Sequence, residues 1–241
     1  FLTMKIFIGT IFSFFLISEA PSTWGFYAHS LINRLAVFSL PEEMIGFYKP
    51  QIQYITENAV NPDRRRYAVK GEAEKHYIGD LNVPLHTTVN YNGQLTDQVG
   101  IHGFWESRVP ELQAKDYPFW IGQAEYVEKP QLALWDAVAE AHAKVDSVLL
   151  IEKELTKNFS SDQKFSYEER NNLTVRVYSK EFTEAYALAL NGQVERQMKQ
   201  SIKMIADFWF TAWVNAGQPD LTTFSMEAIE EEDIIPDSKI K

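Results

Sequence analysis

The stretch Pro130–Leu155 reads PQLALWDAVAEAHAKVDSVLLIEKEL and decides the fold class. It opens with a proline, which suits the first turn of a helix. Its apolar residues then recur at helical spacing: Leu132, Trp135, Val138 and Ala139. A second such stretch, Ser179–Val214, is interrupted only at Asn191-Gly192. No segment shows convincing strand alternation, so we predict an all-α chain.

Shorter helical patterns lie on the N-terminal side of these two stretches. We predict helices over Tyr27–Val37, from Pro41 onward, over Glu72–Leu81 and over Ile101–Leu112. Loops are expected at Asn58–Val69 and from Pro84 to about Gly100, where proline, asparagine and glycine gather. Four tryptophans are assigned to the core, namely Trp105, Trp120, Trp135 and Trp213.

The length and composition indicate one globular domain. The chain has 241 residues, of which 45% are hydrophobic and 14% aromatic, enough to bury a full core. We expect a single helical domain over residues 24–225, followed by an acidic tail over 226–241. A monomer with no protein partner is the simplest expectation.

The first 23 residues have the pattern of a secretory signal peptide. Lys5 precedes the uncharged segment Ile6–Ile17, and small residues follow before Trp24. A membrane-spanning helix needs about 20 apolar residues, so cleavage is favoured over anchoring. We therefore expect residues 1–23 to be upstream residues and signal peptide, and the mature protein to be secreted or periplasmic.

Charge and cysteine content exclude several function classes. The net charge of −10 disfavours binding to duplex nucleic acid, because proteins bind its phosphates mainly through Lys and Arg. With no cysteine, the chain has neither disulfides nor thiolate metal ligands. No phosphate-binding loop of the Walker type and no Gly-x-Ser-x-Gly elbow occurs. These absences favour metal-assisted hydrolysis over other phosphate chemistries.

The informative feature is the histidines and their neighbouring carboxylates. His76 and Asp80 are four residues apart, as are His102 and Glu106, so each pair would share one face of a helix. That spacing suits two ligands on one metal ion, although a single such pair also arises on solvated helices. His86 lies between the pairs and would need an acceptor at its second nitrogen to fix the tautomer.

Three motifs together resemble the superfamily of zinc-dependent phospholipase C and single-strand nucleases. They are WGFYAH at 24–29, HYIGDLNVPLH at 76–86 and HGFWE at 102–106. Within that superfamily the motif sequences are most similar to those of bacterial secreted members of the phospholipase C type. The resemblance covers most of the chain after the signal and implies three zinc ions in a helical cleft that hydrolyses phosphate esters.

The resemblance also implies a ligand for each ion. Trp24, as the mature N-terminus, and His29 would bind the first zinc, and Asp80 would bridge it to the second. Asp63 and His76 would hold the second, and the third would be bound by His86, His102 and Glu106. Asp63 is also the candidate that orients or deprotonates the attacking water, although turn chemistry explains an Asp after Pro62 equally well.

One departure from the family pattern leaves two functions open. In the family, one metal-binding histidine follows the carboxylate and a separate histidine begins the His-x-x-x-Asp motif, whereas here His76 must serve both. A deletion between two similar His-Tyr-Ile sequences would produce this arrangement, leaving two or three zinc ions. The first function is a secreted zinc phosphodiesterase that acts on phospholipid head groups or on nucleotides and single-stranded nucleic acid. The alternative is a zinc-stabilised helical binding protein without turnover.

Overall fold

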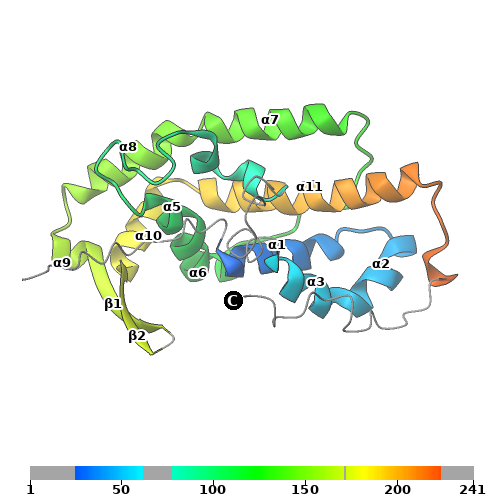
Figure 1. Cartoon of the computed structure of the whole chain (residues 1–241), viewed down its shortest axis with the longest axis horizontal. Helices are drawn as coiled ribbons and strands as arrows, with labels where there is room; N and C mark the ends of the chain where they lie inside the picture. Colours follow the sequence, from blue (N-terminus) through cyan, green and yellow to red (C-terminus); the bar gives the residue numbers. More distant parts are fainter. Residues whose placement is uncertain (1–24, 62–77, 171, 224–241) are drawn as a thin grey trace, which may run out of the picture.

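The computed structural model describes residues 25–61, 78–170 and 172–223, and these residues are mostly helical (Figure 1). The α-helices are α1 (Phe26–Val37), α2 (Glu42–Tyr48), α3 (Ile52–Asn58), α5 (Ile101–Gly103), α6 (Val109–Gln113), α7 (Pro130–His142), α8 (Val145–Thr156), α9 (Ser161–Lys164), α10 (Lys180–Ala189) and α11 (Gln193–Asn215). The tighter 3-10 turns are η1 (Lys49–Gln51), η2 (Asp80–Asn82), η3 (Pro84–Thr87), η5 (Ala114–Asp116) and η6 (Leu221–Thr223). A π-helical turn, η4 (Phe104–Arg108), joins α5 to α6.

Two short turns lie between the long helices. In Figure 1, α7 and α8 follow one another along one long side of the molecule, and α11 runs beside α7. The turns η2 and η3 pack against α7, and η2 also packs against α11. On its other side, α11 contacts α1, which in turn contacts α3. The segment 80–87 is therefore enclosed by helices rather than carried on an exposed loop.

The core is built from aromatic and aliphatic side chains of α1, η4, α10 and α11. Its largest buried side chains are those of Trp105, Tyr186, Phe104 and Phe182. The Phe104 ring stacks on Tyr178 with centroids 3.8 Å apart. Helix α11 contributes a stripe at helical spacing, consisting of Val194, Met198, Ile202 and Ile205.

Several predicted elements are confirmed. Helix α1 begins one residue before the predicted start, and α2 follows Pro41 as expected. The break at Asn191-Gly192 separates α10 from α11, and both residues have positive φ. Residues 1–23 and 226–241, and most of the helix predicted over Glu72–Leu81, lie outside the described residues. In the described ranges, no helix combines the length and the apolar character needed to cross a bilayer.

The prediction of a chain without strands is wrong at one place. Strands β1 (Phe165–Arg170) and β2 (Leu173–Tyr178) form an antiparallel hairpin. The sequence signal is the alternation in LTVRVY together with an Asn-Asn turn, in which Asn172 has a φ of +62°. The described residues are therefore mostly helical, with one small hairpin.

The prediction for Pro130–Leu155 is wrong in two respects. The pattern is divided at Ala143-Lys144 into α7 and α8. The buried face of α7 carries the small residues Ala137 and Ala141, which let η2 and η3 approach closely. Trp135 consequently points outward.

The core assignment of the tryptophans is confirmed for Trp105 and, in part, for Trp213, which packs against the core. Trp105 is fully buried, and Trp213 is half-buried with its indole N–H donating to the Pro219 carbonyl. Trp120 and Trp135 are 89% and 64% exposed, so their assignment to the core is wrong. Trp120 lies between Phe119 and Ile121, which pack on the core, while its own side chain is exposed.

A buried ion pair ties α8 to the end of α9, next to the hairpin, and yields a stability prediction. Glu152 is 1% exposed and its carboxylate lies 2.6 Å from Lys164 Nζ, which is surrounded by the Phe165, Tyr178 and Phe182 rings. We expect Glu152→Ala to lower the free energy of unfolding by about 3 kcal/mol, because it leaves a buried ammonium without its carboxylate.

Urea denaturation measures this change. The control is Glu154→Ala, which breaks the exposed pair with Lys157 and should change stability by less than about 0.5 kcal/mol. Similar losses in the two variants would contradict the assigned role of the buried pair.

Candidate metal centre

Five ligand-type side chains from different elements converge in the interior. They come from α1 (His29), η2 (Asp80), η3 (His86), α5 (His102) and η4 (Glu106). The first two and the last two are at most 5% exposed, and the His86 side chain is 12% exposed. Buried charged groups require partners or a metal ion, so this cluster is the strongest candidate for a functional site.

The distances place His86 between two carboxylates. Its Nε2 lies 3.4 Å from Glu106 Oε2, and its Nδ1 lies 3.8 Å from Asp80 Oδ1. His102 Nε2 is 3.0 Å from the same Glu106 oxygen, and His29 Nε2 is 3.4 Å from Asp80 Oδ1. The cluster thus has two halves, His102–Glu106 and His29–Asp80, that meet at His86.

A main-chain acceptor sets the tautomer of His86. Its Nδ1 lies 3.1 Å from the carbonyl oxygen of Asp80, and this carbonyl can only accept a hydrogen bond. Nδ1 therefore carries the proton in the neutral ring, and the lone pair of Nε2 is directed toward Glu106. A metal-binding His86 needs an acceptor of this kind to fix its tautomer, as predicted from the sequence.

Glu106 lacks the hydrogen bonds that a buried carboxylate normally receives. Both of its side-chain oxygens are inaccessible to solvent and accept no hydrogen bond from the described residues. Burial raises the pKa of Glu106 from 4.5 to about 7, and the nearby His86 opposes part of this shift. A bound cation would compensate the buried charge.

The geometry fits a metal ion. Ligand atoms of His86, His102 and Glu106 all lie within 4.8 Å of one another. Two ligands on one tetrahedral zinc ion are about 3.4 Å apart, given metal–ligand distances of about 2.0–2.1 Å. The contacts of 3.0 and 3.4 Å to Glu106 Oε2 match that spacing. This donor set of imidazoles and a carboxylate is one that zinc accepts.

Polar side chains of α11 hold the turn that carries Asp80. Gln197 donates to the main-chain oxygen of Asn82 at 2.7 Å, and Ser201 contacts that of Gly79 at 3.4 Å. Gln197 and Ser201 are buried and four residues apart. Sequence reasoning missed these positioning residues, although two polar residues on the apolar face of α11 were a usable signal.

A close approach of backbones places α1 beside η4. Gly25 precedes α1, and a Cβ added to it would lie 3.1 Å from Ser107 Cα and nearer still to the Ser107 side chain. Only glycine therefore fits at this position without movement of η4. The contact brings the first turn of α1, with His29, next to the residue that follows Glu106.

The structure brings together five of the eight predicted ligands. These are the five cluster residues named above. The other three, Trp24, Asp63 and His76, lie outside the described residues. In comparisons with profiles of protein families, with curated proteins and with solved structures, no match to this chain was found.

Proposed function

We propose that the protein is a secreted zinc-dependent phosphodiesterase that hydrolyses phosphate esters. The observation that supports this most is the convergence of three imidazoles and two carboxylates in the interior. When bound, zinc ions would lower the pKa of coordinated water and offset charge on the phosphoryl oxygens. The lack of cysteine and of a serine-nucleophile motif supports hydrolysis without a covalent intermediate.

The chain's own residues would divide this work between holding ions and orienting water. His86, His102 and Glu106 would hold one ion, whereas His29 and Asp80 would hold a second together with the Trp24 amino terminus. His76 and Asp63 complete the proposed set. Asp63 would accept a proton from the attacking water, and the hydrogen bond from His86 to the Asp80 carbonyl would keep the imidazole oriented.

Zinc content and turnover test the proposal together. The mature protein, with its amino terminus verified at Trp24, is analysed by mass spectrometry and assayed on bis-p-nitrophenyl phosphate before and after chelation. The proposal predicts two or three zinc ions per chain and turnover that is lost on chelation and restored by zinc. Hydrolysis that persists after exhaustive metal removal would contradict it.

A second candidate is a zinc-stabilised helical binding protein without turnover. It is favoured by the single His76, which stands where the family pattern has two metal-binding histidines. Two or fewer bound zinc ions combined with no turnover would support this candidate. Turnover that depends on both Asp63 and His86 would exclude it.

A loop beside the cluster favours phospholipid over nucleic acid as the substrate. Residues 88–100 connect His86 to His102, and the Tyr91 ring lies 6.0 Å from that of His102. Val89, Leu95 and Val99 of this loop are 66–82% exposed. Exposed apolar side chains that gather at one place commonly mark an interaction site. The loop has no basic residue to attract a nucleic-acid backbone.

Buried amide side chains keep this loop rigid. Asn90 accepts a hydrogen bond from the Leu95 main chain at 2.8 Å, and Gln98 donates to the Leu149 carbonyl at 2.8 Å. Both amides are 7% exposed. The apolar side chains are therefore presented to solvent by a fixed scaffold and could insert into a lipid surface.

We predict that the double variant Val89→Ser, Leu95→Ser lowers hydrolysis of phosphatidylcholine vesicles about 30-fold, because each insertion contributes about 1 kcal/mol. Hydrolysis of the soluble bis-p-nitrophenyl phosphate should be unchanged. The matched control is Leu188→Ser on α10, since Leu188 is 82% exposed, as Val89 is. Equal losses on both substrates would argue against a lipid-binding role for the loop.

A further inference from the structure

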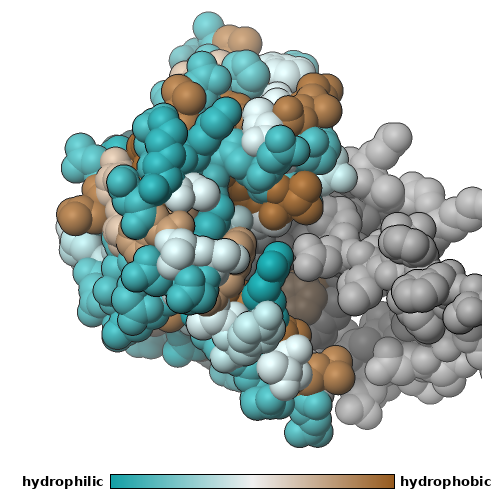
Figure 2. Space-filling view, turned by 90° about the vertical axis from the view of Figure 1, so that its left-hand side faces the viewer, coloured by the Kyte–Doolittle hydropathy of each residue, from teal (hydrophilic) through white to brown (hydrophobic). Residues whose placement is uncertain are grey.

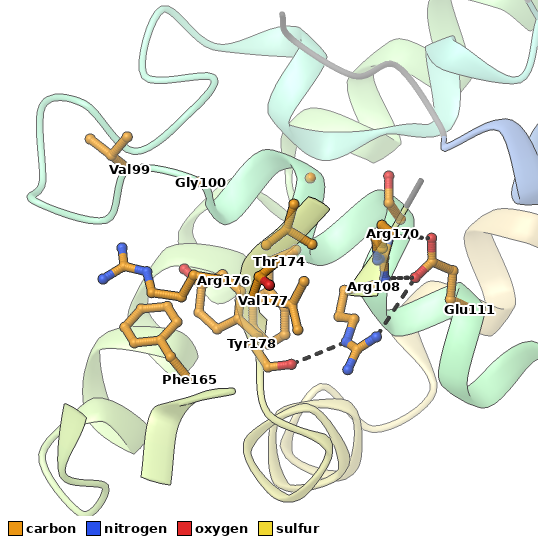
Figure 3. A pocket seen from close by; sticks show the side chains of 14 residues that line it. Val99, Gly100, Arg108, Glu111, Phe165, Arg170, Thr174, Arg176, Val177 and Tyr178 are labelled. Atoms are coloured by element: carbon orange, nitrogen blue, oxygen red, sulfur yellow. Dashed lines mark hydrogen bonds and ion pairs between the residues drawn. The ribbon is translucent and has the colours of Figure 1, made fainter. Parts of the chain in front are cut away.

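A cleft separates the β-hairpin from the helical segment α5–η4–α6 (Figure 3). Its volume is about 450 Å³, within the range of small-molecule sites. The helical wall contributes Gly100, Gly103 and Ser107, which are three and four residues apart and so lie on one face. A Cβ at Gly100 would meet no atom within 4 Å, so this wall leaves the space open.

Two of the three arginines that line the cleft are neutralised by carboxylates. Arg108 binds Glu168 through both terminal nitrogens and donates from Nε to the Tyr178 carbonyl at 3.1 Å. Arg170 binds Glu111 at 2.9 Å and Glu168 at 3.2 Å. Figure 3 shows Arg108 and Arg170 beside Glu111 on one side of the cleft.

Arg176 is different, because no carboxylate of the described residues pairs with it. Its guanidinium lies over the Phe165 ring, 4.4 Å from the centroid, on the side of the cleft opposite Glu111 (Figure 3). The group of three arginines and two carboxylates therefore keeps one positive charge in a protein whose net charge is −10. That charge faces space a ligand can enter.

The remainder of the lining is largely apolar. Phe104, Phe165, Val177 and Tyr178 contribute to it, and Phe104 and Tyr178 are stacked and buried beneath the surface. The face of the molecule that includes the hairpin is otherwise mostly hydrophilic, with separate hydrophobic patches (Figure 2). The cleft thus combines one uncompensated cation with an apolar floor.

We propose that this cleft binds a small amphipathic anion. A carboxylate or phosphate group of the ligand pairs with Arg176, and an apolar body lies against Phe165 and Val177. The site is distinct from the metal cluster and does not depend on zinc. It shares one helical segment with the cluster, since Gly103 follows His102 and Ser107 follows Glu106 in the chain.

Calorimetric titration of the full chain with octanoate, octyl phosphate and octanol tests the proposal. Octanoate and octyl phosphate distinguish a carboxylate from a phosphate as the preferred group, and octanol reports the apolar contribution alone. We expect Arg176→Gln to weaken binding of the preferred anion about tenfold and to leave octanol unchanged. The control Lys157→Gln removes an exposed cation directly after α8 and should change neither.

A second variant tests the location. Thr174 lines the cleft from an exposed position on β2, so Thr174→Trp should fill the space and reduce binding of all three probes at least fivefold. The unfolding transition of each variant verifies its fold. Failure of both anions to bind the wild type at 10 mM would overturn the proposal. So would octanoate and octanol affinities that fall equally in Arg176→Gln, or binding that Thr174→Trp does not affect.

Discussion

Replacing Glu106 by Gln is expected to lower turnover of a phosphodiester about 1,000-fold and to remove at least one zinc ion. Gln keeps the shape of the side chain but lacks the negative charge. In the wild type the charged oxygen Oε2 lies 3.4 Å from His86 Nε2 and 3.0 Å from His102 Nε2. Removal of one oxyanion-hole donor costs about 100- to 1,000-fold, and we expect the loss of a charged metal ligand to lie at the upper end of that range. Turnover and metal content are measured on the same preparation. The control is Glu154→Gln, an exposed residue of α8, which should change neither.

The same substitution should stabilise the metal-free protein. Burial raises the pKa of Glu106 from 4.5 to about 7. In the metal-free protein, protonated Glu106 therefore makes its full contribution to the free energy of unfolding below pH 4.5, and this contribution is lost as the pH rises through 7. At pH 8 the folded wild type holds a buried carboxylate at a cost of up to about 3 kcal/mol. Glu106→Gln has no such cost.

Chemical unfolding of the two metal-free proteins checks this crossover. The variant should be the more stable one at pH 8 and should match the wild type at pH 4. A variant that keeps its zinc, or is less stable than wild type at pH 8 without metal, would contradict the role assigned to Glu106.

Removing zinc from the wild type should produce the second large effect. Binding to the folded state alone adds about 4 kcal/mol to the free energy of unfolding when free zinc is about 1,000 times the Kd. Chelation is therefore expected to lower the midpoint of urea denaturation markedly at pH 8. Magnesium at the same concentration should not restore it, because imidazole-rich sites favour zinc.

Zinc affinity should also depend on pH. Zinc must displace the proton of Glu106 below its pKa of about 7, so affinity falls about tenfold from this group between pH 8 and pH 6. Titration with a competing chelator at the two pH values measures the change. Affinity that is constant over this range would show that Glu106 is not a ligand.

The sequence predicted the cluster better than the surfaces around it. His102 and Glu106 are adjacent in the structure because their spacing of four residues is a local property of one helical segment. The proximity of His29 to Asp80 depends on how α1 packs, and only the family resemblance suggested it. The roles of Gln197 and Ser201 were missed because a helix pattern does not show which turn a polar side chain supports.

The wrong placement of Trp135 in the core has a physical origin in the composition of α7. The exposed face of α7, with Trp135, and the buried face, with Ala137 and Ala141, both carry apolar residues. Periodicity therefore could not say which face packs on η2 and η3. The cleft beside the hairpin was equally inaccessible to sequence reasoning, since Arg176 and Gly103 are brought together only by the way the hairpin packs.

Anomalous diffraction at the zinc absorption edge, from crystals of zinc-loaded mature protein, tests the central claim most directly. The account predicts a peak bonded to His86, His102 and Glu106, with a second beside His29 and Asp80. Zinc found only at surface sites, with no peak inside this cluster, would contradict the account.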